Sequence, residues 1–152
     1  RNPHRVHPQI FQISNFTAYS LQIPQPVAVG IAKALTVDFI NDKGVFEGGN
    51  ISLGMQSRCR ALNTFTKRLP LIEPGSRIND FGKKTAEAME SGVVLGMIFE
   101  VEGYINKYPA HKVVFTGGDA FYFAEKLKSP IFVVPNLVLV GLALIADYYA
   151  QN

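Results

Sequence analysis

Residues 34–51, ALTVDFINDKGVFEGGNI, limit the folds open to this chain more than any other stretch. Apolar and polar residues alternate on both sides of NDKG, which is the pattern of two antiparallel strands joined by a short turn. Gly44 lies in this turn, and glycine readily adopts the positive φ that such turns often need. The pattern therefore predicts a hairpin, and the segments that follow it must pack on the resulting sheet.

Two helices are predicted after the hairpin. The segment 54–70, GMQSRCRALNTFTKRLP, has apolar residues at helical spacing and ends at a proline. A longer helix is predicted from about 83 to 108, because apolar residues recur there every four positions and form one buried stripe. The stripe consists of Met89, Val93, Met97, Val101 and Ile105.

Strands and helices alternate in the last third of the chain. The sequence predicts a strand at KVVFT (112–116), a helix at GDAFYFAEKLK (118–128), a strand at IFVV (131–134) and a helix at LVLVGLALIADYY (137–149). Asn136 has the side chain of a helix N-cap for the last of these. This order of elements predicts an α/β domain with a mixed sheet flanked by helices.

The front of the chain differs in composition from the rest. The first 37 residues contain no Asp or Glu, whereas all 12 acidic residues follow them. The periodicity of this segment is also poor. We therefore expect two parts: residues 1–26 as a divergent or unreliable segment, which could be a fragment edge or an out-of-frame stretch, and residues 27–152 as a folded lobe.

Bulk properties exclude several classes of protein. At 47% hydrophobic and 18% charged, the 152 residues can bury a core. The net charge of +3 comes without a Lys/Arg run interleaved with aromatics, so nucleic-acid binding is not expected. Pro135 interrupts the longest apolar stretch, 131–146, well short of the ~20 residues that span a bilayer. Cys59 is the sole cysteine, which favours helix packing and a reducing, cytoplasmic location.

Three short motifs are candidate ligand contacts. The diglycine Gly117–Gly118, followed by Asp119, fits a strand-to-helix turn, and it also exposes backbone on which a nucleotide can lie. GGNISLG (48–54) fits a bulge or tight turn, or an approach to a helix N-terminus. Thr85, beside two lysines, fits a helix cap or a hydroxyl contact to a polar substrate. From the residues alone the structural reading is favoured in each case.

The order of these motifs is more specific than any one of them. The chain resembles the C-terminal half of type III pantothenate kinases over roughly residues 27–150. The resemblance rests on the stretches ALTVDFI, GGNIS, FTGGDA and VPNLVL, on an R, AL, T and LP that follow GGNIS in this order, and on a G, T and EA that come before FTGGDA. The resemblance implies the RNase H-like fold of the acetate-kinase, sugar-kinase, Hsp70 and actin superfamily. It also implies a cytoplasmic homodimer that phosphorylates pantothenate with ATP, the first step of coenzyme A biosynthesis, using Mg²⁺ and K⁺ or NH₄⁺.

The resemblance assigns roles to several residues and leaves others without one. Thr85 matches the threonine that contacts pantothenate, and Gly117, Gly118 and Asp119 match the adenosine-side motif. Gly30 stands where the family has the aspartate that binds the monovalent cation. Lys33 stands where the family has a threonine that contacts ATP. Nothing in residues 1–29 matches the Asp-x-Gly-Asn phosphate block or the Gly-x-Asp-Arg block that carries the catalytic aspartate.

These departures bear on activity, because phosphoryl transfer needs clamped phosphates and a proton-accepting carboxylate. We assign no catalytic residue and no metal ligand, and we expect a truncated fragment without useful kinase activity. An alternative is a non-catalytic regulatory or binding member of the same family, of the Bvg accessory factor type. A third hypothesis is a superfamily kinase that acts on another small substrate.

Overall fold

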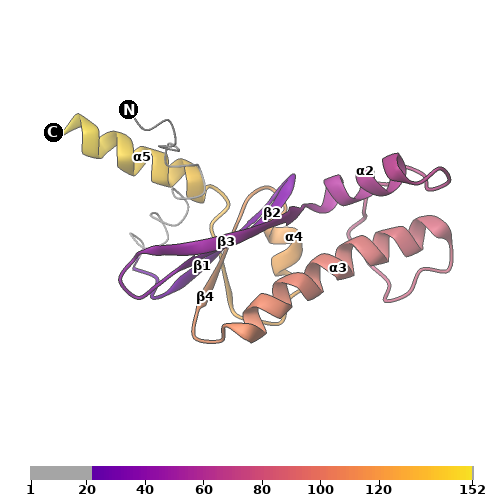
Figure 1. Cartoon of the computed structure of the whole chain (residues 1–152), viewed down its shortest axis with the longest axis horizontal. Helices are drawn as coiled ribbons and strands as arrows, with labels where there is room; N and C mark the ends of the chain where they lie inside the picture. Colours follow the sequence, from indigo (N-terminus) through magenta and orange to yellow (C-terminus); the bar gives the residue numbers. More distant parts are fainter. Residues whose placement is uncertain (1–21, 152) are drawn as a thin grey trace, which may run out of the picture.

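The computed structural model describes residues 22–151 as one mixed sheet with helices on both faces and at one end (Figure 1). The elements in chain order are β1 (Pro26–Ile31), β2 (Ala34–Ile40), β3 (Phe46–Leu53), α2 (Met55–Phe65), α3 (Thr85–Lys107), β4 (Lys112–Thr116), α4 (Ala120–Ala124), β5 (Ile131–Val133) and α5 (Leu137–Ala150). No helix among these residues is long and apolar enough to cross a membrane.

The five strands are ordered β3-β2-β1-β4-β5. β2 pairs antiparallel with both β1 and β3, while β4 pairs parallel with both β1 and β5. The mixed sheet predicted from the sequence is therefore confirmed. β1 lies at its centre, between the antiparallel and the parallel half, and this strand was not among the predicted elements.

The predicted hairpin is the β2–β3 pair. Its turn is closed by Asn41, whose side-chain oxygen accepts the backbone N–H groups of Lys43 at 3.0 Å and Val45 at 2.9 Å. Gly44 has φ 75°, the left-handed conformation expected of it. The GGNISL stretch lies inside β3, where Gly48 has φ 122° and the β2–β3 pairing shifts register between Phe39 and Ile40, which fits the bulge expected of this motif.

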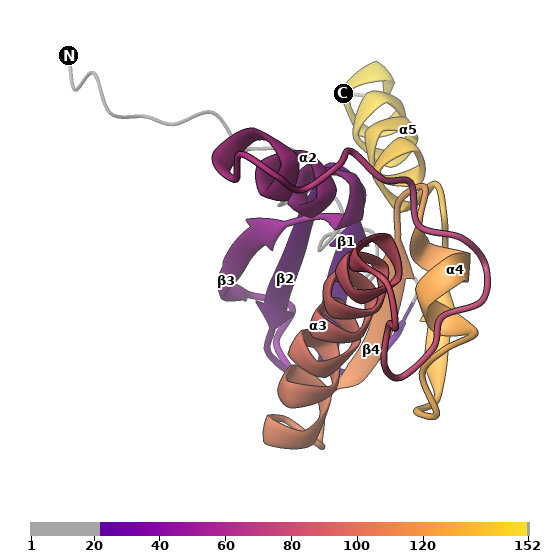
Figure 2. The same ribbon diagram turned by 90° about the vertical axis from the view of Figure 1, so that its right-hand side faces the viewer.

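One face of the sheet carries the main hydrophobic core. Val27, Val29 and Ile31 of β1 point to this face, together with Leu35 of β2 and Phe115 of β4, and all five are buried. Helices α3 and α4 lie over this face in Figure 2, whereas α5 lies behind the sheet. Because side chains alternate along a strand, Ala28 and Gly30 belong to the opposite face.

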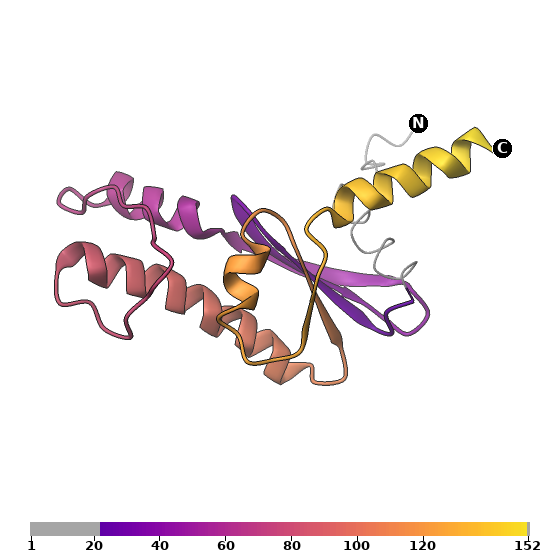
Figure 3. The same ribbon diagram turned by 180° about the vertical axis from the view of Figure 1, so that it is seen from behind.

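The α3 stripe is confirmed: Met89, Val93, Met97 and Val101 are buried, and Ile105 packs against the core. α2 and α3 run side by side and extend beyond the end of the sheet (Figures 1 and 3). Cys59 of α2 is fully buried in the same cluster, which agrees with its predicted packing role. Residues 1–21, most of the segment predicted to be divergent, lie outside the described residues.

The last two helices differ from each other in how they sit on the sheet. α4 is only five residues long, so the helix predicted over 118–128 was drawn too long. α5 begins at Leu137, which is buried against Val114 and Val134, and then projects away from the sheet (Figure 3). Its outer residues Leu139, Leu142 and Leu144 are exposed.

Candidate functional site

Three turns meet at the carboxyl end of β1. The carbonyl of Ile31 accepts the backbone N–H of Asp119 at 3.1 Å, and the N–H of Gly117 reaches the carbonyl of Pro135 at 3.3 Å. The turns after β1, β4 and β5 are therefore tied together by backbone hydrogen bonds. In open α/β sheets the carboxyl ends of parallel strands are the usual place for a ligand.

A cavity of about 600 Å³ opens beside these turns, and we call it the hairpin pocket. It is lined by the β1–β2 hairpin, the end of β4 and the start of α5; the polar or backbone-exposing residues among its walls are Gly30, Lys33, Thr36, Asp38, Thr116, Gly117 and Asn136. The structure thus brings together Gly30, Lys33 and Gly117, three of the positions singled out in the sequence.

Lys33 lies at the turn between β1 and β2, and its backbone is held from two sides. Its carbonyl accepts the N–H of Gly54 at 3.0 Å and the hydroxyl of Ser57 at 2.6 Å. Gly54 follows β3 as the N-cap of α2, and Ser57 lies in the first turn of that helix, so the β1–β2 turn is bonded to the start of α2. The Lys33 side chain is exposed, and no carboxylate within residues 22–151 forms an ion pair with it.

Gly30 leaves no room for a side chain in the present arrangement. A Cβ atom built on it would lie 2.7 Å from the hydroxyl oxygen of Thr36, its cross-strand neighbour on β2. Thr36 is buried, with 8% of its surface exposed. A carboxylate at position 30 would therefore need Thr36 to move. Among residues 22–151 no cluster of three or more His, Cys, Asp or Glu side chains could hold a metal ion.

Asp38 is the carboxylate of the hairpin pocket. It is 6% exposed, and burial raises its pKa from 3.8 to about 6. It lies opposite Gly49 in the β2–β3 register, and a Cβ on Gly49 would collide with its Oδ1 atom. The second glycine of GGNISLG therefore makes room for a buried acid. Alternation along β2 places Thr36 and Asp38 on one face, and this was the signal from which both could have been chosen as site residues.

The two glycines of the 117–118 pair have different roles. Gly117 has φ 96°, and a Cβ there would lie 2.5 Å from the carbonyl of Ile31, so the close turn requires glycine. Gly118 has no atom within 4 Å of its Cβ position. Asp119 follows at the N-cap position of α4 without a side-chain cap bond, and burial raises its pKa. The first glycine thus fits the structural reading, while the second leaves backbone open.

Thr85 lies elsewhere. It is the first residue of α3, and the N-cap is Lys84, with no side-chain cap hydrogen bond, so the capping interpretation of Thr85 was wrong. Its exposed side chain lines a second cavity of about 850 Å³ between α2 and α3, which we call the interhelical groove. The structure does not bring Thr85 into the hairpin pocket.

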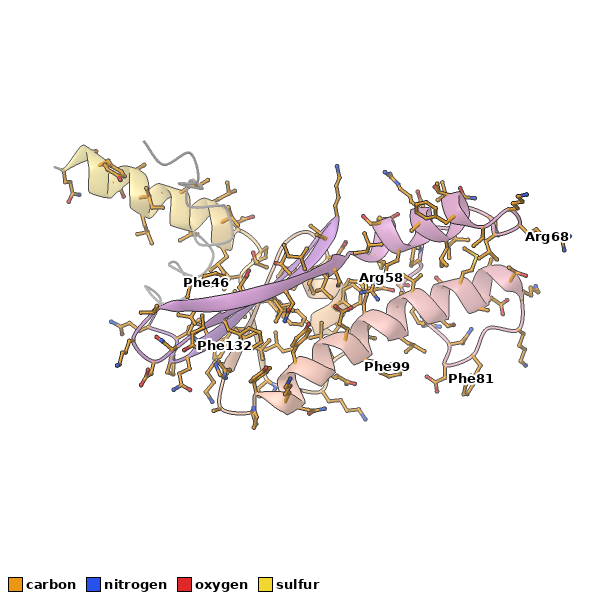
Figure 4. All side chains as sticks on the ribbon, viewed as in Figure 1. Phe46, Arg58, Arg68, Phe81, Phe99 and Phe132 are labelled. Carbon is orange, nitrogen blue, oxygen red and sulfur yellow. The ribbon has the colours of Figure 1, made fainter. Side chains whose placement is uncertain are left out.

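The interhelical groove is mostly apolar and is held by one charged pair. Arg58 forms a salt bridge to Glu100 of α3 and donates through Nε to the carbonyl of Leu53 at 2.7 Å. Figure 4 shows Arg58 between the start of α2 and the middle of α3. Leu53 also lines this groove, and it is half exposed.

Comparison with protein families gives one match of more than half the chain. The family model described as "Type III pantothenate kinase" matches residues 13–107. A relative of that name from Cytophaga hutchinsonii is 45% identical over 122 residues, and one from Bacteroides fragilis is 43% identical over 126 residues. These alignments cover 78% and 80% of this chain and 52% of each relative, so the chain spans about half the length of the curated relatives it matches.

Solved structures establish the fold. A Baf family protein from Campylobacter jejuni superposes with a TM-score of 0.69 at 22% identity, covering 99% of this chain and 69% of that one. The activator of 2-hydroxyisocaproyl-CoA dehydratase from Clostridium difficile, solved with bound ADPNP, superposes with a TM-score of 0.55 at 13% identity, covering 92% and 67%. The predicted actin-like ATPase and sugar-kinase fold is confirmed.

Proposed function

Since the chain belongs to the type III pantothenate kinase family, we propose that it provides the nucleotide-binding lobe of an enzyme that transfers a phosphoryl group from ATP to pantothenate. The product, 4'-phosphopantothenate, starts coenzyme A biosynthesis. The observation that carries this proposal is the meeting of three turns around the hairpin pocket, with an exposed lysine at its rim and open backbone at Gly118 close by.

In this proposal the parts of ATP lie over different turns. The adenosine end rests against Gly117, Gly118 and Asp119, where no side chain fills the space beside Gly118. The phosphates point toward Lys33 at the β1–β2 turn, because an ammonium group attracts phosphate oxygens. Mg²⁺ accompanies the phosphates, as phosphoryl transfer requires their charge to be neutralised.

Pantothenate is assigned to the interhelical groove. Its hydroxyl and amide groups need polar partners, and the Thr85 hydroxyl is exposed there and free of a capping role. Its branched carbon skeleton suits a groove whose other walls are largely apolar.

We further propose that the protein is cytoplasmic and forms a homodimer. The dimer is supported by exposed aromatic side chains on the two helices that line the groove, such as Phe65, 86% exposed, and Phe99, 63% exposed.

The proposal separates binding from turnover for the 152-residue chain. No acidic residue precedes Asp38, so no carboxylate stands in the front segment to take the pantothenate hydroxyl proton. We therefore expect this chain to bind ATP·Mg²⁺ without transferring its γ-phosphate. Isothermal titration with ATP·Mg²⁺, paired with a coupled assay of phosphoryl transfer to pantothenate, tests both statements. Absence of ATP binding refutes the nucleotide site, and steady turnover refutes the statement on catalysis.

Thr85 is tested with a matched control on the neighbouring helix. Thr85→Ala is expected to weaken pantothenate binding about tenfold, the worth of one good hydrogen bond. Thr64→Ala removes another exposed hydroxyl, from α2 and outside the groove lining, and should leave the affinity unchanged. Equal affinities for wild type and Thr85→Ala would remove pantothenate from this groove.

A further inference from the structure

The hairpin pocket lacks the side-chain carboxylate that the family resemblance implies for a monovalent cation. The family resemblance implies such a cation at residue 30, which here is a glycine without a side-chain oxygen, and the place where its Cβ would stand is 2.7 Å from the Thr36 hydroxyl. Hard cations require several oxygen ligands. Asp38 offers the pocket a single buried carboxylate, and residues 22–151 hold no metal-binding cluster of acids or histidines. The implied ion would therefore lose the acid that the resemblance places at residue 30, and the residues present fit it poorly.

The same pocket is lined by a lysine, Lys33, three residues further on. The Lys33 backbone is held by hydrogen bonds from Gly54 at 3.0 Å and Ser57 at 2.6 Å, while its exposed side chain has no carboxylate partner among the described residues. The backbone of Lys33 is therefore held in place, while its ammonium group forms no ion pair within residues 22–151. Lys33 lines the pocket together with Thr116 and Gly117.

A lysine ammonium can do what a bound monovalent cation does beside a phosphate. Both carry one positive charge, and the ammonium group adds three N–H donors that phosphate oxygens accept. The bound ion must be recruited from solution, whereas the lysine is part of the chain and is always present. A protein with such a lysine has no need of the ion's charge at that place.

We propose that Lys33 takes the place of the monovalent cation, so that this chain binds ATP·Mg²⁺ equally well with and without K⁺ or NH₄⁺. The inference rests on the proposed function, since it assumes that the hairpin pocket receives the phosphates of ATP. The inference states that the Lys33 ammonium group, and not a bound monovalent cation, contacts those phosphates. It therefore predicts that the Kd of ATP·Mg²⁺ does not depend on the monovalent cation in the buffer, which nucleotide binding alone does not predict.

The experiment is a calorimetric titration of the 152-residue chain with ATP·Mg²⁺ in KCl, in NH₄Cl and in choline chloride at one ionic strength. Choline is too large to enter a small-cation site. The wild type is expected to show the same Kd in all three salts within about twofold. Lys33→Met keeps the length of the side chain and removes its charge, and should weaken binding about tenfold or more in every salt, the worth of a charged hydrogen bond. Lys33→Arg should restore most of the loss.

Lys43→Met is the matched control, because Lys43 is also an exposed lysine at a hairpin turn but lies at the β2–β3 turn and does not line the pocket. It changes the net charge equally and should leave the Kd unchanged. Circular dichroism confirms that each variant is folded.

The outcomes separate this inference from the proposed function. Tighter binding in KCl than in choline by tenfold, or a Lys33→Met variant that binds like the wild type, overturns the role of Lys33 and leaves ATP as the ligand. An equal loss in Lys43→Met shows that only net charge matters and also overturns it. No binding of ATP in any salt overturns the nucleotide site and this inference together.

Discussion

The two glycines at the end of β4 offer the sharpest test of the site, because one is required by the fold and its neighbour is not. We consider Gly117→Ala beside Gly118→Ala. Both variants add one methyl group to adjacent residues of the same turn. In Gly117 that methyl group would stand 2.5 Å from the carbonyl oxygen of Ile31, at a φ of 96°. In Gly118 no atom lies within 4 Å of it.

The expected loss for Gly117→Ala follows from three contributions. A left-handed backbone costs an alanine about 1–2 kcal/mol. Relieving the clash moves the turn away from β1 and weakens the hydrogen bond from the Asp119 N–H to the Ile31 carbonyl, worth about 1 kcal/mol. The lower entropy of the unfolded alanine chain returns about 0.4–1 kcal/mol. The free energy of unfolding should therefore fall by about 2 kcal/mol.

Urea denaturation followed by circular dichroism measures this loss. With an m-value of about 1–3 kcal/mol/M, the midpoint of Gly117→Ala should move down by roughly 1 M, and that of Gly118→Ala should stay within about 0.3 M of the wild type. ATP binding should respond in a different pattern, because the added methyl of Gly118→Ala fills the space proposed for adenosine and weakens binding without loss of stability. Equal midpoints for the two variants would refute the turn packing from which the hairpin pocket is built.

Three further predictions concern neighbouring groups. Burial raises the pKa of Asp38 from 3.8 to about 6, so the protonated carboxyl stabilises the fold fully below pH 4, and this stabilisation is lost as the pH rises through 6. Asp38→Asn should therefore stabilise the fold by as much as about 3 kcal/mol at pH 7 and by little at pH 4. Urea midpoints measured at both pH values test this. Burial also raises the pKa of the Cys59 thiol, so Ellman's reagent should label it in urea but not in the native protein, and rapid native labelling would contradict its packing in the core. Arg58→Ala should cost about 1–2 kcal/mol, as it loses both the Glu100 pair and the bond to Leu53, and a loss abolished by high salt would show that the ion pair alone matters.

Helices and strands could be predicted from the sequence where apolar residues recur at a regular spacing along the element. The β4 strand was predicted with its observed bounds, and α3 within two residues at each end, since their apolar spacing is regular. β1 was missed, because PVAVGI is a central strand flanked by strands on both sides and has no polar alternation. β1 also lies within the first 37 residues, which contain no acidic residue and have poor periodicity, and this made the strand harder to recognise.

The site could be predicted only in part. Gly30, Lys33 and Gly117 meet in one pocket because short turns at the carboxyl ends of neighbouring strands must lie together. Thr85 lies in another cavity, and no local pattern shows this. The long loop before α3 is positioned by distant bonds, such as the Tyr122 hydroxyl to the Gly75 carbonyl at 2.7 Å. Such contacts depend on the complete fold rather than on spacing within a segment.

The two faces of β1 separate the residues that hold the fold from those that line the hairpin pocket. Val27, Val29 and Ile31 point into the core, so their loss would cost several kcal/mol each. Gly30 points to the other face, where it meets Thr36 and the hairpin pocket rather than the core. A side chain at position 30 therefore adds little to the core and bears mainly on which ion or ligand the pocket accepts. In our proposal, position 30 affects which ion the pocket binds without affecting the fold, and Lys33 at the adjoining turn supplies the positive charge from a position that the core does not constrain.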